Sequence, residues 1–251
     1  DSKGYSGSVI KLSKSFEYIK KCSENIFEIG ASSWVPGVVK YLSNIGFGGI
    51  EHCIGIPATF GGLIAMNGGS QRKSIKERLV EVKYIDSDGE EKLYKPHDDD
   101  FSYRSSPFKN AAKLITSAKI HCKEIKPNQN RPELISILRE RRKKFPRKIP
   151  NCGSVFLSTN EIFEKVGPPG YVIESLGLKG KKVGDAEISR LHANFIVNNN
   201  SANSDDVLKL VEIINSSCFD KYGFQLVAEA IYYPKFGKPV CLSDANLEKI
   251  K

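Results

Sequence analysis

The chain has 251 residues, of which 38 are Lys or Arg and 29 are Asp or Glu, giving a formal net charge of +9. Hydrophobic residues make up 40% of it, a globular composition that excludes disordered, collagen-like and low-complexity proteins. No apolar run approaches the roughly 20 residues that cross a bilayer, and the first residues lack the apolar stretch of a secretory signal. The length suits one large domain or two ordinary ones.

The six cysteines and four histidines are scattered, without the spacing of a metal or redox motif. We therefore expect reduced thiols, a cytoplasmic location, no disulfide framework and no metal. Because the chain begins with Asp1 and its single Met is Met66, we expect a fragment, a processed product or a trimmed chain. The positive charge is compatible with a plain basic surface or with an anionic ligand.

Short strands and one helix are predicted near the start of the chain. Strands are expected at residues 9–10 and 26–29. The serine pair 32–33 is typical of a helix cap, with Pro36 in the first turn and Gly46 as the stop. The apolar face of this helix is predicted to consist of Val38, Val39, Leu42 and Ile45.

A hairpin and a basic helix are predicted next. Residues 79–85 and 92–94 flank an Asp-Ser-Asp-Gly turn sequence at 86–89. Residues 127–142 fit a helix with a basic end, which the helix dipole favours, and the pattern changes at 143–150. The inward positions of this helix are predicted to be Leu134, Ile135 and Leu138.

The second half again mixes helices and strands. Helices are predicted at residues 170–176 and 204–219, and strands at 193–197 and 225–232. Both halves are mixed and contain no internal repeat, which predicts the α+β class.

The stretch 46–69 is rich in glycine, and closely spaced glycines let the backbone approach an anion or a flat ring. It does not match the dinucleotide fingerprint, so its spacing alone favours a tight structural turn. Arg104 stands between aromatic and hydroxyl residues and could present its planar fork to a carboxylate or phosphate, or be a plain surface residue. Ser154 could donate a proton, although a lone serine is usually structural. Glu229 in an apolar strand is predicted to lie on a wet face or to be functional.

Taken in order, these segments resemble the family of UDP-N-acetylenolpyruvoylglucosamine reductase, also called UDP-N-acetylmuramate dehydrogenase. The match runs from Gly4 to about Tyr232, and the short interval between Arg104 and Ser154 resembles the family's second subtype. The sequence departs from the family pattern in two places, at residues 157–159 and at Asp185. The resemblance is carried by residues 55–62, Met66, Asn67, Tyr103, Arg104, residues 153–156, 177–180 and 192–198, and Glu229.

The resemblance implies an α+β fold in which part of an FAD-binding domain of the vanillyl-alcohol-oxidase type precedes an α+β substrate-binding domain. We assign the remainder of the FAD-binding domain to residues 1–146, the substrate-binding domain to 147–233 and a C-terminal tail to 234–251. A preceding subdomain with a glycine-rich loop for the FAD diphosphate is expected to be missing, because Asp1 aligns just after it.

The resemblance also implies a reaction: FAD-dependent, NADPH-consuming reduction of UDP-N-acetylglucosamine enolpyruvate to UDP-N-acetylmuramate, in peptidoglycan precursor synthesis. Arg104 would stabilise developing negative charge, Ser154 would protonate C2, and Glu229 would polarise the substrate carboxylate. Expected FAD contacts are Gly55, Ile56, Pro57, Thr59, Gly61, Gly62 and Asn67. Expected substrate contacts are Tyr103, Arg141, Arg142 and Lys143, the cations binding the diphosphate.

Two other functions remain open on the sequence. One is a nucleotide-sugar-binding protein without flavin, and the other is a related flavin oxidase that acts on another sugar or alcohol. Nucleic acid is disfavoured as a partner, since no recognised motif interleaves aromatics with the cations, and no membrane partner is expected.

Overall fold

The computed structural model describes residues 1–109 and 111–245, which form two compact units. The N-terminal unit is Ile10–Arg141, and the C-terminal unit joins Asp1–Val9 to the chain from Arg142 onward. The division therefore falls inside the helix α3 (Arg131–Lys144). The functional domain limits at 146/147 and 233/234 stay a prediction, and residues 246–251 of the expected tail lie outside the described residues.

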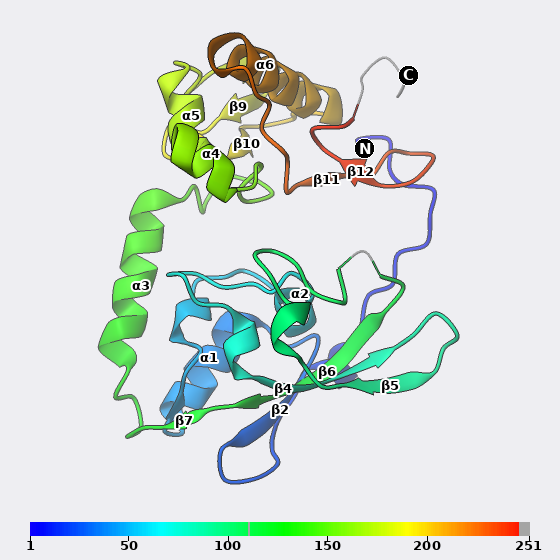
Figure 1. Ribbon diagram of the computed structural model, residues 1–251, viewed down its shortest axis with the longest axis vertical. Helices are drawn as coiled ribbons and strands as arrows, with labels where there is room; N and C mark the ends of the chain where they lie inside the picture. The colour runs from blue at the N-terminus through cyan, green and yellow to red at the C-terminus, as the bar shows by residue number, and fades with distance from the viewer. Residues whose placement is uncertain (110, 246–251) are drawn as a thin grey trace. The chain divides into compact units, whose positions relative to one another are not determined.

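The N-terminal unit is built on an antiparallel five-stranded sheet of order β1-β2-β6-β4-β5, with helices on one face (Figure 1). A separate short pair joins β3 with β7. The strands are β1 (Ile19–Lys21), β2 (Ile26–Gly30), β3 (Phe47–Gly48), β4 (Leu79–Ile85), β5 (Glu91–Tyr94), β6 (Leu114–His121) and β7 (Lys123–Glu124). The helices are η1 (Lys14–Phe16), α1 (Val35–Asn44), η2 (Glu51–Cys53), α2 (Phe60–Ala65), η3 (Ile75–Arg78) and η4 (Asp98–Asp100).

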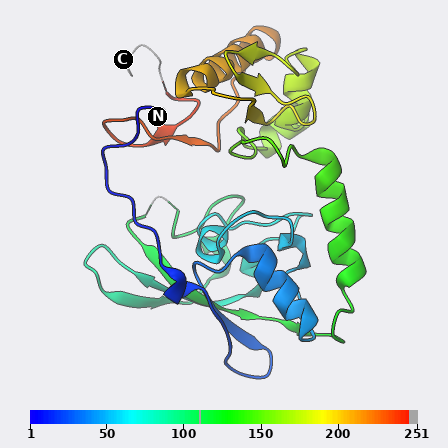
Figure 2. The same ribbon diagram turned by 180° about the vertical axis from the view of Figure 1, so that it is seen from behind.

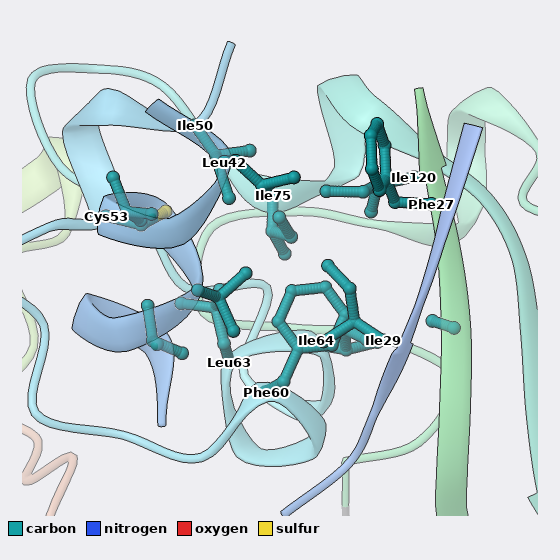
Figure 3. Close-up of a cluster of buried hydrophobic side chains, with 14 of the residues drawn as sticks. Phe27, Ile29, Leu42, Ile50, Cys53, Phe60, Leu63, Ile64, Ile75 and Ile120 are labelled. Carbon is teal, nitrogen blue, oxygen red and sulfur yellow. The ribbon is translucent and has the colours of Figure 1, made fainter. Parts of the chain in front are cut away.

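The core of this unit fills the space between sheet and helices (Figure 3). Alternate residues of β2 point inward, and Phe27 lies opposite Ile120 of β6 in the register. They face buried residues of the helical layer, including Phe60 and Ile64 of α2. This packing fixes α2, and with it the glycine-rich stretch, against the sheet.

In the C-terminal unit, the helix α6 (Ser204–Tyr222) packs on a three-stranded antiparallel sheet (Figures 1 and 2). Asn203 caps α6 by accepting from the N–H of Asp206 at 3.0 Å, and Gly223 ends it with φ 74°. The remaining elements are α4 (Asn160–Lys165), α5 (Pro169–Ser175), β8 (Lys182–Val183), β9 (Ala186–Ile188), β10 (Ile196–Asn198) and the hairpin strands β11 (Ile231–Tyr232) and β12 (Val240–Cys241).

The α+β class is confirmed, as are the strand near 26–29, the 79–94 hairpin and the helices near 170 and 204. The strand predicted at residues 9–10 is wrong, because these residues belong to no strand and both side chains are exposed. The serine pair 32–33 does not cap α1, whose N-cap is Trp34; the Ser33 hydroxyl donates to the carbonyl of Tyr18 instead. Ile45 ends the helix and is exposed rather than inward.

Helix α3 begins at Arg131 rather than 127, and it buries Leu134 and Ile137 while Ile135 is exposed. A stripe at i, i+3 and i+4 explains this, since position 135 lies off it. The strand predicted at 193–197 is displaced to β10, and that at 225–232 shrinks to β11. In the part of the chain that the structure describes, no helix is long and apolar enough to cross a membrane.

Candidate active site

Arg104 stands at the tip of a tight turn in the N-terminal unit. Ser102 and Ser105 exchange backbone hydrogen bonds of 3.2 and 3.1 Å, so Tyr103 and Arg104 form a two-residue loop. Arg104 has φ 54°, a left-handed conformation that is costly for a residue with a Cβ. Its carbonyl accepts from Nζ of Lys109 at 2.9 Å, and its guanidinium lies 5.3 Å from the centre of the Tyr103 ring.

Asn67 ties the end of α2 to this turn. Its Nδ2 donates to the carbonyl of Ser102 at 2.9 Å, and the hydroxyl of Ser106 donates to the carbonyl of Ala65 at 2.7 Å. Asn67 is 7% exposed, and its Oδ1 has no hydrogen-bond partner. A buried acceptor without a partner is unusual in a folded protein and suits a bound group that carries a donor.

Gly61 is explained by close packing, and Gly62 lies in the first turn of α2. A Cβ on Gly61 would lie 2.9 Å from the Cβ of Ala31, and the Gly61 N–H already donates to the Ala31 carbonyl at 2.9 Å. The Gly62 N–H donates to Oγ1 of Thr59, the N-cap of α2, at 3.4 Å. The N–H groups of Gly61 and Gly62 are therefore committed inside the protein.

Gly55 and Arg141 lie in direct contact within the N-terminal unit. A Cβ built on Gly55 would be 2.1 Å from Cδ and 2.4 Å from Nε of Arg141. Only glycine at position 55 therefore allows the guanidinium to lie there. The structure thus brings together one expected cofactor contact and one expected diphosphate contact.

Ser154 and Glu229 are brought together in the C-terminal unit. The Glu229 N–H donates to the carbonyl of Val155, the residue after Ser154, at 2.7 Å. Phe156 and Ala228 form an isolated antiparallel bridge beside them. Both Ser154 and Glu229 are half-buried, and Glu229 lies in a bend before β11 rather than in the expected apolar strand.

Asn194 clamps the Ser154 segment, a role that the sequence analysis did not assign. Its carbonyl accepts from the N–H of Val155 at 2.8 Å, while its side chain bonds both backbone groups of Phe156 at 2.9 Å. Asn194 is buried, so these bonds replace a missing strand partner. The sequence signal that could have indicated this role is an asparagine next to apolar residues in the stretch His-Ala-Asn-Phe.

A cavity of about 920 Å³ lies within the C-terminal unit. Burial alone would raise the pKa of its Glu187, but the hydrogen bond from Asn199 and the charge of Lys182 hold that pKa below its ordinary value. Glu187 is therefore an ionised carboxylate among cations. An anionic ligand would have to bind to the cations of the cavity and not to Glu187. The lining cations are Arg142, Arg147, Lys148 and Arg190.

Among the residues that the structure describes, no group of three His, Cys, Asp or Glu could hold a metal ion. Tyr103 is 61% exposed, and Lys143 is exposed as well. Ile56 donates its N–H to the carbonyl of Cys53 at 2.9 Å, and Pro57 has no N–H to offer.

A family model described as "UDP-N-acetylenolpyruvoylglucosamine reductase, C-terminal domain" matches residues 145–233, and one described as "FAD binding domain" matches residues 1–92. UDP-N-acetylenolpyruvoylglucosamine reductase 1 of Corynebacterium glutamicum is 40% identical over 233 residues, covering 92% of this chain and 69% of that protein. The reductase of Syntrophomonas wolfei is 33% identical over 228 residues, covering 90% and 74%.

A solved structure of UDP-N-acetylenolpyruvylglucosamine reductase from Thermus caldophilus superposes with a TM-score of 0.68 and 30% identity, covering 79% of this chain and 70% of that one. The sequence matches span most of both chains, and the structural match shows the same fold. The chain therefore belongs to the UDP-N-acetylenolpyruvoylglucosamine reductase family of flavoprotein oxidoreductases, which have FAD as cofactor and NADPH as reductant.

Proposed function

We propose that this chain reduces UDP-N-acetylglucosamine enolpyruvate to UDP-N-acetylmuramate in peptidoglycan precursor synthesis, with FAD bound and NADPH consumed. The observation that carries the proposal is the pairing of Ser154 and Glu229 through the 2.7 Å bond from Glu229 N–H to Val155. This bond keeps the segment with the Ser154 hydroxyl group next to the segment with the Glu229 carboxyl group. We place the reaction in the cytoplasm, where six free cysteines remain reduced.

The buried, unpartnered Oδ1 of Asn67 supports FAD as the bound group, because a flavin ring carries an N–H donor that could satisfy it. Asn67 would hold the ring, and Gly55 to Pro57 with Thr59, Gly61 and Gly62 would allow the cofactor to approach the backbone. When bound and reduced, FAD supplies the hydride that reaches C3 of the enolpyruvyl group.

Arg104 would face the negative charge that develops at C2 and the carboxylate as C3 is reduced. Its planar guanidinium can bond a carboxylate with two parallel hydrogen bonds, and it needs no reorganisation if held in advance. The Ser102–Ser105 bridge and the bond from Asn67 restrain its turn.

Ser154 would complete the reaction by donating its hydroxyl proton to C2. A well-placed donor of this kind contributes about 10²–10⁴ in rate. Glu229 would polarise the substrate carboxylate, for which its carboxyl group must carry a proton or bond to a cation. Its backbone link to the Ser154 segment supports this division of roles.

Arg141, Arg142 and Lys143, with Tyr103, would bind the UDP diphosphate. Support comes from Arg142, which lines the cavity of about 920 Å³ with three more cations, and from Arg141, which lies on Gly55. Arginine suits a diphosphate because its fork can contact two oxygens at once.

The test is an anaerobic assay of the chain loaded with FAD. NADPH should bleach the flavin, the enolpyruvyl sugar nucleotide should restore it, and mass spectrometry should identify UDP-N-acetylmuramate. A chain that binds the sugar nucleotide but never FAD would instead be a binding protein. A further outcome is that the enolpyruvyl compound never reoxidises a flavin that NADPH or another sugar or alcohol has reduced. That result would indicate an oxidase with another substrate.

A further inference from the structure

Glu229 lies in a short irregular stretch, residues 227–230, that is held between two other segments of the C-terminal unit. On one side, the Glu229 N–H donates to Val155 at 2.7 Å and the Leu157 N–H donates to Val227 at 2.9 Å. These bonds tie the stretch to the segment of Ser154. On the other side lies the β11–β12 hairpin with its continuation at residues 241–243.

Ala228, directly before Glu229, presents both of its backbone groups to side chains of that continuation. Its N–H donates to Oγ of Ser243 at 3.2 Å, and its carbonyl accepts from Sγ of Cys241 at 2.9 Å. Ala230, directly after Glu229, accepts from the N–H of Leu242 at 2.9 Å. The stretch therefore has strand-like neighbours on both sides, but on this side two of the three bonds come from side chains.

Burial makes these two side chains hard to replace. Ala228 is 4% exposed, so little water can reach its N–H or carbonyl when a partner is removed. A buried backbone group left unpaired favours rearrangement of its segment. Rotation about the Ala228 backbone would swing the Glu229 carboxyl group away, because the two residues are adjacent in the chain.

We infer that Ser243 and Cys241 are positioning residues that fix the Glu229 carboxyl group for catalysis by bonding the backbone of Ala228. The inference rests on the proposed function, in which Glu229 acts on the substrate carboxylate. Both residues follow position 233, where the match to the C-terminal family domain ends. The two bracing side chains thus lie outside that matched domain, whereas Ala228 and Glu229 lie inside it.

Hydrogen exchange tests the brace itself, on the FAD-loaded chain and without any substrate. Ser243→Ala should speed amide exchange at residues 227–230, and Ser243→Thr, which keeps the hydroxyl group, should not. Ser175→Ala is the matched control, because that half-buried hydroxyl bonds Val172 and Tyr222 instead. Unchanged exchange at 227–230 in Ser243→Ala would overturn the inference.

Kinetics test whether the brace acts through Glu229. Ser243→Ala should slow flavin reoxidation by the enolpyruvyl substrate about 10- to 100-fold, while flavin reduction by NADPH stays unchanged. Cys241→Ala should act in the same direction, and Cys241→Ser, which keeps a donor, should recover most of the rate. In a Glu229→Gln background, Ser243→Ala should add little further loss.

Equal losses from Ser243→Ala in the wild-type and Glu229→Gln backgrounds would overturn the positioning role, because a general structural defect would act in both. A wild-type chain that binds FAD but never turns over the enolpyruvyl substrate would overturn the proposed function, and the catalytic part of this inference with it. The exchange result separates the two failures, since it does not depend on turnover.

Discussion

Asn67 donates from Nδ2 to the carbonyl of Ser102 at 2.9 Å, which anchors the turn that carries Arg104 to the end of α2. Asn67, an expected FAD contact, is therefore joined directly to the turn of Arg104, the expected catalytic cation. The other end of that side chain, Oδ1, is buried without a partner, so the same residue both shapes the turn and leaves an acceptor for a ligand.

Replacing Asn67 by Ala should weaken FAD binding and lower the stability of the N-terminal unit by about 0.5–1.5 kcal/mol, because the carbonyl of Ser102 loses its donor. Fluorescence titration with FAD and denaturant unfolding measure the two effects. Asn25→Ala is the matched control, since Oδ1 of Asn25 is also buried without a partner but is assigned no ligand. Equal FAD affinity in wild type and Asn67→Ala would remove Asn67 from the flavin site.

Gly55→Ala should weaken FAD or diphosphate binding, because its Cβ would lie 2.1 Å from Cδ of Arg141 and must displace that side chain. Gly37→Ala, in an exposed part of α1, should instead stabilise the chain by about 0.5–1 kcal/mol. Calorimetric titration with FAD and with the UDP-sugar compares the variants. Undiminished binding of both ligands by Gly55→Ala would contradict a ligand role for this contact.

Ser154→Ala should leave flavin reduction by NADPH intact and slow reoxidation by the enolpyruvyl substrate about 10²–10⁴-fold. Ser154→Cys, which keeps a weaker donor, should recover part of this loss. Anaerobic stopped-flow absorbance separates the two half-reactions. A similar loss in both would show that Ser154 does not serve as the proton donor.

Arg104→Lys should be nearly inactive in reoxidation, because a point charge cannot replace the planar fork. Arg72→Lys serves as the control, as Arg72 also has a left-handed φ, of 61°, and has no assigned role. Near-normal turnover of Arg104→Lys would place Arg104 outside the site.

Stability should decrease as the pH falls below about 6.5, the unfolded-state pKa of histidine. Burial holds the pKa of His52 below its ordinary value of 6.5, against the opposing charge of Glu77. At low pH the unfolded state then binds a proton that the folded state does not bind. The free energy of unfolding therefore decreases as the pH decreases. Burial acts the same way on His192, in the other unit.

Urea unfolding of the N-terminal unit at about pH 7.5 and about pH 5.5 measures this effect. His52→Phe, which is close in shape and has no titratable group, should flatten the dependence for that unit. The carboxyl group of Glu51, whose pKa is lowered from 4.5, titrates below this window. An unchanged slope in His52→Phe would contradict the assignment.

Much of the fold could be predicted where a signal was local. The apolar period of α6 and the turn sequence at 86–89 each specify a local structure, and both elements formed. The stretch 225–232 does not form the single predicted strand, because its neighbours come from residues 155–157 and 241–243, which no local pattern reveals. Two of its bonds use side chains, which lie outside ordinary strand pairing.

The candidate site was predictable as a set of residues but not as contacts. Glycine spacing cannot distinguish close packing from ligand approach, and Gly61 proves to pack on Ala31. The clamp by Asn194 was not foreseen either, because an amide that bonds a distant backbone leaves no periodic trace.

The most direct test of the account is the recovery of the visible flavin band in a single anaerobic turnover. The FAD-loaded chain is bleached with NADPH and then mixed with the enolpyruvyl sugar nucleotide. We predict that the oxidised flavin band returns as UDP-N-acetylmuramate forms in equal amount. A band that stays bleached in the presence of saturating enolpyruvyl substrate would contradict the reductase function.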